Sequence, residues 1–134
     1  MTAAESCGLF ADAKPGVPRR ALPPEPTVET TETLTLTCSF RVGVGTHVVD
    51  VVDQRPDGRS WLVGSLAKTA ETPGSYHWEI PLSALRIEGR HEFFLELDGT
   101  RLPNAITVHV QSPPKAPRLR ARRRTGRYLG RGRV

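Results

Sequence analysis

The C-terminal stretch of the sequence holds the densest set of residues that could take part in chemistry. Residues 115–134 contain nine of the nineteen Lys and Arg residues and no Asp or Glu. A guanidinium group offers a planar fork of hydrogen-bond donors that fits phosphate or carboxylate oxygens. The stretch is therefore predicted to bind an anionic partner through Arg118, Arg120, Arg122, Arg123, Arg124, Arg127, Arg131 and Arg133.

The composition of this stretch limits which kinds of anionic partner it can bind. Tyr128 is its one aromatic residue, so contact with nucleic acid is expected to reach backbone phosphates rather than bases. An acidic protein surface fits the same arginines, whereas anionic lipid fits least, because the stretch lacks an apolar face. The other 114 residues carry ten cations and fourteen anions, a net charge of −4. The chain therefore divides into a mildly acidic body and a basic tail.

The four histidines do not cluster in the sequence. His47, His77 and His109 alternate onto the outward faces of expected strands, and His91 stands at the start of another strand. We interpret all four as surface or cross-strand polar residues.

Neither metal binding nor catalysis is favoured by the remaining polar residues. His47 and Asp53 share one face of an expected strand, while Asp50 points to the other face, which disfavours a shared metal site. Ser39 and Ser83 have no adjacent base, and the sequence has no Gly-x-Ser-x-Gly motif. The expectation is a protein that is not an enzyme and that has no cofactor and no metal site.

Two cysteines, Cys7 and Cys38, occur in the chain. Cys38 alternates with Leu34, Leu36 and Phe40, which indicates a buried thiol within a strand. A Cys7–Cys38 bridge is the alternative if the protein resides in an oxidising compartment. Two cysteines so far apart do not form a zinc signature.

The elements that must position these groups are strands, because apolar residues recur with a period of two. Residues 75–80, 91–97 and 104–110 alternate in this way, and Asp98-Gly99 between the last two is a strong signal for a tight turn. The inward side chains are expected to be Tyr76, Trp78, Ile80, Phe93, Leu95, Leu97, Ile106, Val108 and Val110.

The preceding residues predict further strands. Residues 34–40 alternate with Thr and Ser facing water. The Val-rich segment 46–54 suits a strand buried on both faces. A turn is expected at 55–59, and residues 60–67 are expected to form the next strand. Residues 81–85 resemble one helical turn that crosses between two sheets.

The segment Tyr76-His-Trp-Glu-Ile-Pro81, followed by Leu85 and Gly89-Arg-His-Glu-Phe-Phe94, resembles the later part of immunoglobulin-like and fibronectin-type-III-like modules. The resemblance covers about residues 27–110. It implies an all-β fold, an antiparallel immunoglobulin-like β-sandwich of about six or seven strands. Unlike a true immunoglobulin domain, the chain has no second strand cysteine to pair with Cys38 across the sheets. No functional residue carries over.

Three regions are expected along the chain. Residues 1–26 form an N-terminal arm, with a short helix over 2–13 that offers Leu9 and Phe10 to a partner, and then a Pro-rich extended segment. Residues 27–111 form the β-sandwich domain, and residues 112–134 form the Arg-rich tail. No apolar run approaches the roughly 20 residues that span a bilayer, and no secretory signal is seen. The expected location is the virion if the protein is viral, and otherwise the cytoplasm.

These features favour a non-enzymatic structural component of a large assembly. The most concrete hypothesis is a viral or phage capsid decoration or cement protein whose arms clamp neighbouring subunits. Its partners would be protein subunits of a capsid-like assembly, with nucleic-acid backbone contact through the tail, and no small-molecule substrate or membrane. The first alternative is a ribonucleoprotein or ribosome-associated protein that binds RNA backbone through the tail. The second is an extracellular adhesion module.

Overall fold

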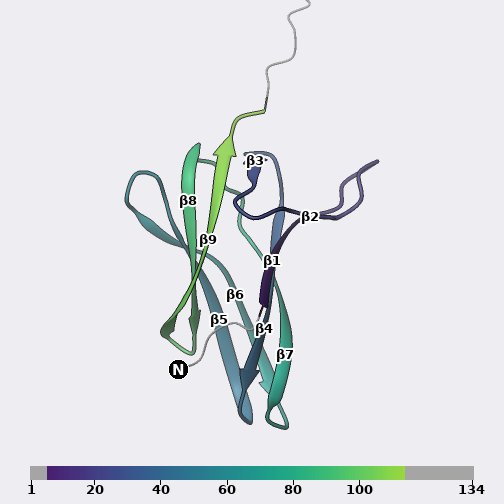
Figure 1. Cartoon of the computed structure of the whole chain (residues 1–134), viewed down its shortest axis with the longest axis vertical. Helices are drawn as coiled ribbons and strands as arrows, with labels where there is room; N and C mark the ends of the chain where they lie inside the picture. Colours follow the sequence, from purple (N-terminus) through teal and green to yellow (C-terminus); the bar gives the residue numbers. More distant parts are fainter. Residues whose placement is uncertain (1–5, 114–134) are drawn as a thin grey trace, which may run out of the picture.

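The structure, a computed structural model, describes residues 6–113, and the regular elements among these residues are all strands. Figure 1 shows them as two layers that run along the long axis of the molecule. The strands are β1 (Ser6–Ala11), β2 (Arg20–Ala21), β3 (Thr27–Glu29), β4 (Leu34–Val42), β5 (Gly45–Gln54), β6 (Ser60–Ala70), β7 (Gly74–Pro81), β8 (Gly89–Leu97) and β9 (Thr100–Gln111). The all-β prediction is confirmed.

The strands form one four-stranded and one five-stranded sheet. The first has the order β2-β1-β4-β7, and the second has the order β3-β9-β8-β5-β6. Neighbouring strands are antiparallel, except that β3 runs parallel to β9. Consecutive strands change sheet several times along the chain, so the two sheets share one core rather than forming separate units.

The predicted inward faces of β7, β8 and β9 fill this core. Trp78 and Phe40 meet edge to face, with ring centroids 5.3 Å apart. The buried side chains include Trp78, Ile80, Phe93, Leu95, Leu97, Val108 and Val110, as expected from their alternation, whereas Tyr76 and Ile106 are only partly buried. The expectation that the Val-rich segment is buried on both faces is wrong. Val49 and Val51 are fully buried, but Val48 is 37% exposed, because β5 has one face toward the core and one toward solvent.

The turn between β8 and β9 confirms the Asp98-Gly99 signal. Leu97 pairs with Thr100, which leaves two residues in the loop. Both have left-handed backbone angles, with φ of 52° at Asp98 and 84° at Gly99. This is the conformation that a two-residue hairpin turn requires, and Asp and Gly tolerate it better than most residues.

The helix predicted over residues 2–13 is wrong where the structure describes it. Residues 6–11 form β1, which pairs with β4 along its whole length, with Leu9 opposite Leu36. Leu9 and Ala11 alternate into the core and are 5% and 0% exposed. A strand at this edge both covers β4 and buries two side chains, whereas so short a helix would bury little.

The Pro-rich segment, predicted as part of an extended arm, also packs on the body. Arg20 and Ala21 pair with β1, and the Leu22 backbone N–H donates to the Leu9 carbonyl at 2.9 Å. Pro26 is buried, and β3 begins directly after it. The segment lacks many backbone donors, so it follows the sheet edge with few ladder hydrogen bonds.

Two threonines of β4 were expected to face water but are nearly buried. Thr35 and Thr37 are 9% and 8% exposed, because β1 and β7 flank β4 on both sides. The Thr35 hydroxyl donates to an Asp12 carboxylate oxygen at 2.7 Å, and the Thr37 hydroxyl donates to the Gly8 carbonyl at 3.3 Å. Both side chains therefore bond β4 to β1 and to the residue that follows it.

The chain crosses between the sheets after β7 without the predicted helical turn. The Leu82 N–H donates to the Leu34 carbonyl at 2.9 Å, and the Ser83 N–H donates to the Val63 carbonyl at 2.8 Å. The crossing segment thus bonds to both sheets at once, and no helical turn forms over these residues. A Cβ atom at Gly64 would lie 2.9 Å from the Leu82 side chain, so this approach requires glycine.

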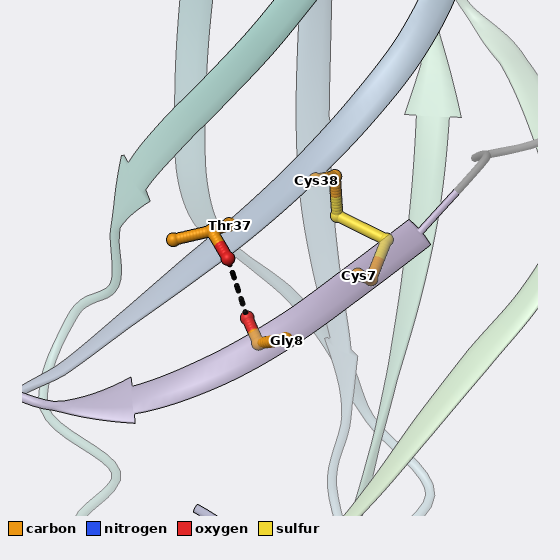
Figure 2. The surroundings of a disulfide bond; sticks show 4 residues. All are labelled: Cys7, Gly8, Thr37 and Cys38. Atoms are coloured by element: carbon orange, nitrogen blue, oxygen red, sulfur yellow. Dashed lines mark hydrogen bonds between the residues drawn. A yellow bond between two sulfur atoms is a disulfide. The ribbon is translucent and has the colours of Figure 1, made fainter. Parts of the chain in front are cut away.

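A disulfide joins Cys7 of β1 to Cys38 of β4 (Figure 2). The two residues lie directly opposite each other in the ladder, with Cα atoms 4.1 Å apart. The expected burial of Cys38 is confirmed at 1% exposure, but its sulfur is bonded and is not a free thiol. The disulfide therefore links β1, the first described strand, covalently to β4, an inner strand of the same sheet.

We predict that Trp78→Ala lowers the free energy of unfolding by about 3–5 kcal/mol, because it empties the space between the sheets. His77→Ala is the matched control, since the His77 side chain is 56% exposed on the opposite face of β7, and it should cost little. Urea unfolding of the two variants measures both values. Equal losses would mean that the assigned register of β7 is off by one residue.

We predict that reducing the disulfide lowers the free energy of unfolding by about 3–4 kcal/mol, the loop-closure value for cysteines 31 residues apart. Urea unfolding with and without dithiothreitol measures this loss. A variant with both cysteines changed to alanine serves as the control, because its unfolding should not respond to the reductant. Coinciding curves for the native protein would show that the bridge does not constrain the chain.

Candidate functional site

The predicted partner-binding arginines lie outside the described residues. These are Arg118, Arg120, Arg122, Arg123, Arg124, Arg127, Arg131 and Arg133. The two other candidates, Leu9 and Phe10, lie in β1 and face opposite sides. Leu9 is buried in the core rather than presented at the surface, and Phe10 is partly buried with the Arg19 guanidinium 4.4 Å from its ring centroid.

Asp53 of β5 and His91 of β8 form a buried pair that sequence reasoning missed. Each side chain is only 1% exposed, so the prediction of a surface role for His91 is wrong. The His91 Nδ1 atom lies 3.0 and 2.8 Å from the two Asp53 carboxylate oxygens, and Nε2 lies 2.6 Å from the Ile87 carbonyl. The carbonyl can only accept, so Nε2 carries a proton and donates it. A second proton is held between Nδ1 and the carboxylate.

This buried pair has a structural role and is closed to solvent. Burial raises the pKa of the Asp53 carboxyl, and the hydrogen bond from His91 acts in the opposite direction. The pair connects two neighbouring strands and, through the Ile87 carbonyl, the crossing segment before β8. The signal was present in the sequence: Asp53 shares its strand face with the buried Val49 and Val51.

A second His–Asp pair anchors the turn between β8 and β9. The His47 Nδ1 atom lies 2.7 Å from one Asp98 carboxylate oxygen, and its Nε2 atom lies 2.8 Å from the Gly43 carbonyl. The other Asp98 oxygen accepts from the Val48 backbone N–H at 2.8 Å. With acceptors at both ring nitrogens, the doubly protonated imidazolium fits this site best.

Each member of this pair shifts the pKa of the other. The hydrogen bond to Asp98, helped by the Gly43 carbonyl, raises the pKa of His47 above its ordinary 6.5. The hydrogen bonds from His47 and from the Val48 N–H lower the pKa of Asp98 below its ordinary 3.8. Asp98 is 45% exposed and His47 is 17% exposed, so the pair borders on solvent, where it fastens a turn and does not offer a sheltered reaction site.

The other polar candidates remain separate. His77 and His109 face outward, as predicted, and their nearest carboxylates are Glu79 and Glu25, both 3.6 Å away. Asp50 accepts a hydrogen bond from the Ser65 hydroxyl at 2.6 Å. Within residues 6–113, no three His, Cys, Asp or Glu side chains are grouped so that they could hold a metal ion. No helix long and apolar enough to cross a membrane occurs in this range either.

A groove of about 340 Å³ lies between β1, the segment after β2, and β9. Leu22, Pro24, Pro26 and Ile106 give it apolar walls, and Glu25 is the one ionisable side chain in its lining. Such a groove can accept an apolar group, but a single exposed carboxylate does not supply an acid and a base together.

We predict that the pair of His47 and Asp98 stabilises the fold between about pH 4 and a value above 6.5. Its contribution is lost as the pH falls through the lowered pKa of Asp98 and as it rises through the raised pKa of His47. Asp98→Asn keeps the turn and the acceptor for Val48, and should return the pKa of His47 toward 6.5. NMR titration of the His47 ring measures this change.

Asp57→Asn is the control for this titration, because Asp57 also precedes a turn glycine but its carboxylate caps the Arg59 N–H instead. That variant should leave the pKa of His47 unchanged. A pKa for His47 that is the same in the native protein and in Asp98→Asn would contradict the assigned hydrogen bond.

Comparison with known proteins yields a likeness of fold. No family model matches the sequence, and no curated protein matches it. Among solved structures, the chain is similar to DesR, a β-glucosidase from Streptomyces venezuelae crystallised with D-glucose, with a TM-score of 0.54 and 14% identity. The match covers 82% of this chain but 15% of the β-glucosidase. At this identity, the likeness shows the fold of one small part of a longer enzyme and carries no activity to this chain.

Proposed function

We propose that the protein is a non-enzymatic attachment module of a large assembly, in which the sandwich is the rigid body and the C-terminal tail is the binding segment. The most concrete form is a decoration or cement protein on a viral or phage shell. The observation that carries the proposal is the position of the tail. β9 ends at Gln111, and the nine cations of the tail follow within residues 115–134.

The way the body ends supports this arrangement. Val110 is buried and pairs with Gly89, and the Ser112 hydroxyl donates to a Glu88 carboxylate oxygen. Pro113 follows, and it has no backbone N–H to donate to a ladder. The tail is therefore joined to a fixed point on a folded body, and many weak charge-assisted contacts made from one anchor reinforce each other.

The order of the strands supports an immunoglobulin-like arrangement of the sandwich. β1, β4 and β7 correspond to strands A, B and E of that fold, and β9, β8 and β5 correspond to strands G, F and C. The solved β-glucosidase contains a part of similar fold. In the proposed role the sandwich is a compact spacer, and the disulfide between Cys7 and Cys38 links its strand β1 to β4.

The polar groups of the body support a structural role. Asp53 and His91 are buried against each other, and His47 and Asp98 fasten a turn. The two His–Asp pairs of the body thus have structural partners. The proposal therefore assigns binding to the cationic tail and assigns no catalytic step to the body.

A second candidate function is an extracellular adhesion module, and the disulfide is the observation that favours it. Such bonds persist in secreted proteins and at cell or virion surfaces, and they are rare in the cytosol. The bond suits a shell protein exposed outside the cell equally well. It counts against a ribosome-associated protein, whose tail would work in a reducing compartment.

The test compares the full-length chain with a chain that ends at Gln111. Thermal unfolding of the two should nearly coincide, because the tail carries like charges that repel one another and few large apolar residues. The longer chain should bind isolated shells and raise their disassembly temperature, and the shorter one should lose most of this binding. A full-length variant with the eight tail arginines changed to lysine keeps the charge but lacks the planar forks, and should bind with intermediate strength.

Two outcomes would contradict the proposal. A shortened chain that unfolds far below the full-length chain would mean that the tail packs on its own sandwich. A shortened chain that binds shells as well as the full-length chain would move the binding site to the body. An extracellular adhesion module would instead leave shell stability unchanged and bind to cell surfaces.

A further inference from the structure

One end of the body carries an exposed aromatic and apolar surface beside the loop between β5 and β6. Trp61 is 47% exposed and Leu62 is 61% exposed, although both begin a strand whose later residues alternate regularly. Exposed tryptophan is uncommon on monomeric surfaces, because burying its ring would remove a large apolar area from water. This site therefore needs an explanation beyond folding.

The Trp61 ring is held in place by the loop. The Arg55 guanidinium carbon lies 4.3 Å from the ring centroid, close enough for a cation–π contact. Arg55 in turn belongs to a tight turn, in which its N–H donates to the Arg59 carbonyl at 2.8 Å and Gly58 has a φ of 86°. The indole thus rests on a prearranged support and still has nearly half of its surface open.

The β5–β6 loop and the start of β8 carry three arginines, Arg55, Arg59 and Arg90. Neither Arg55 nor Arg59 has a carboxylate within ion-pair distance in residues 6–113, and Arg90 makes one 3.6 Å contact with Glu92. A hollow of about 330 Å³ lies among Gln54, Arg55, Pro56, Gly58, Arg90 and Glu92. The Arg55 guanidinium, which makes no ion pair within residues 6–113, therefore lies against the open indole and also lines the hollow.

The tail starts at the same end of the molecule. Gly89 pairs with Val110 near the end of β9, and a Cβ atom on Gly89 would lie 2.7 Å from the Pro56 ring. Figure 1 shows the β5–β6 loop and the last described residues at one end of the body. The surface around Trp61 and the point where β9 ends therefore lie at the same end of the body.

We propose that this end binds single-stranded nucleic acid, with a base stacked on Trp61 and phosphates contacting Arg55 and Arg59. A single strand offers a planar ring and a negative charge at every nucleotide, and both features match this surface. An acidic peptide would match the charge of the arginines but offers no planar ring to stack on Trp61. The body thereby supplies the stacking aromatic that the tail, with Tyr128 alone, lacks. This site goes beyond the proposed attachment function, which assigns binding to the tail only.

The experiment titrates the full-length protein with an oligothymidylate of about ten nucleotides, within the usual range of site sizes. Because Trp78 is buried and Trp61 is exposed, stacking should quench the fluorescence of Trp61. Trp61→Ala should weaken binding roughly tenfold, whereas Leu62→Ala, at a neighbouring side chain that is more exposed than Trp61, should leave it unchanged. Removing the guanidinium groups of Arg55 and Arg59 should reduce the salt slope by about 0.7 for each lost phosphate contact.

Poly-L-glutamate, titrated in parallel, should bind the tail by charge without any dependence on Trp61. Trp61→Ala binding the oligonucleotide as tightly as the native chain would overturn the proposal. Equal dependence of poly-L-glutamate binding on Trp61 would also overturn it, and would assign the surface to an acidic protein. All these variants keep the tail, so their results are independent of the truncation at Gln111.

Discussion

The burial of Trp78 between the two sheets is the constraint on which the rest of the structure depends. The ring meets Phe40 edge to face, which requires β7 to lie beside β4 with Cys38 opposite Trp78. The same register gives β4 its other neighbour, β1, through the bond from Cys38 to Cys7. β7 and β6 are edge strands of the two sheets. The Lys68 ammonium of β6 lies 5.6 Å from the Trp78 ring and donates to the His77 carbonyl of β7, so it links these two edges. One large side chain thus sets the register of three strands and the closure of an edge.

The ionisable groups of the body are arranged to hold loops at the two ends of the sandwich. Asp53 and His91 join β5, β8 and the segment that crosses between sheets, and His47 with Asp98 fastens the opposite turn. The first pair tolerates burial because each polar atom has a partner, which offsets the loss of water. The second works in solvent and is correspondingly pH-dependent. With these groups engaged internally, we propose that the cations near Trp61 and in the tail are the ones that meet a partner.

Much of the body could be predicted from period-two alternation, because β7, β8 and β9 each place apolar residues on a single face. The Asp98-Gly99 turn was equally clear, since few dipeptides accept two left-handed residues in succession. The first strand could not be predicted, because Leu9 and Ala11 are only two inward residues and their partner strand lies more than twenty residues away. Likewise, the crossing at Leu82 and Ser83 is fixed by bonds to Leu34 and Val63, which no local pattern encodes. The buried pair could have been found, because Asp53 falls on the face of Val49 and Val51, but polar residues are seldom expected there.

The central claim is that the sandwich is a frame and that partners are engaged at one end, through cations and Trp61. The most direct measurement is a backbone NMR map of the full-length chain as a negatively charged polymer, either oligothymidylate or poly-L-glutamate, is added. The account predicts shifts confined to the β5–β6 loop, the start of β8 and the residues after Gln111, with the oligonucleotide adding the Trp61 ring. Shifts spread instead over the outer face of β4 and β7, or along the apolar groove at Leu22 and Ile106, would contradict it.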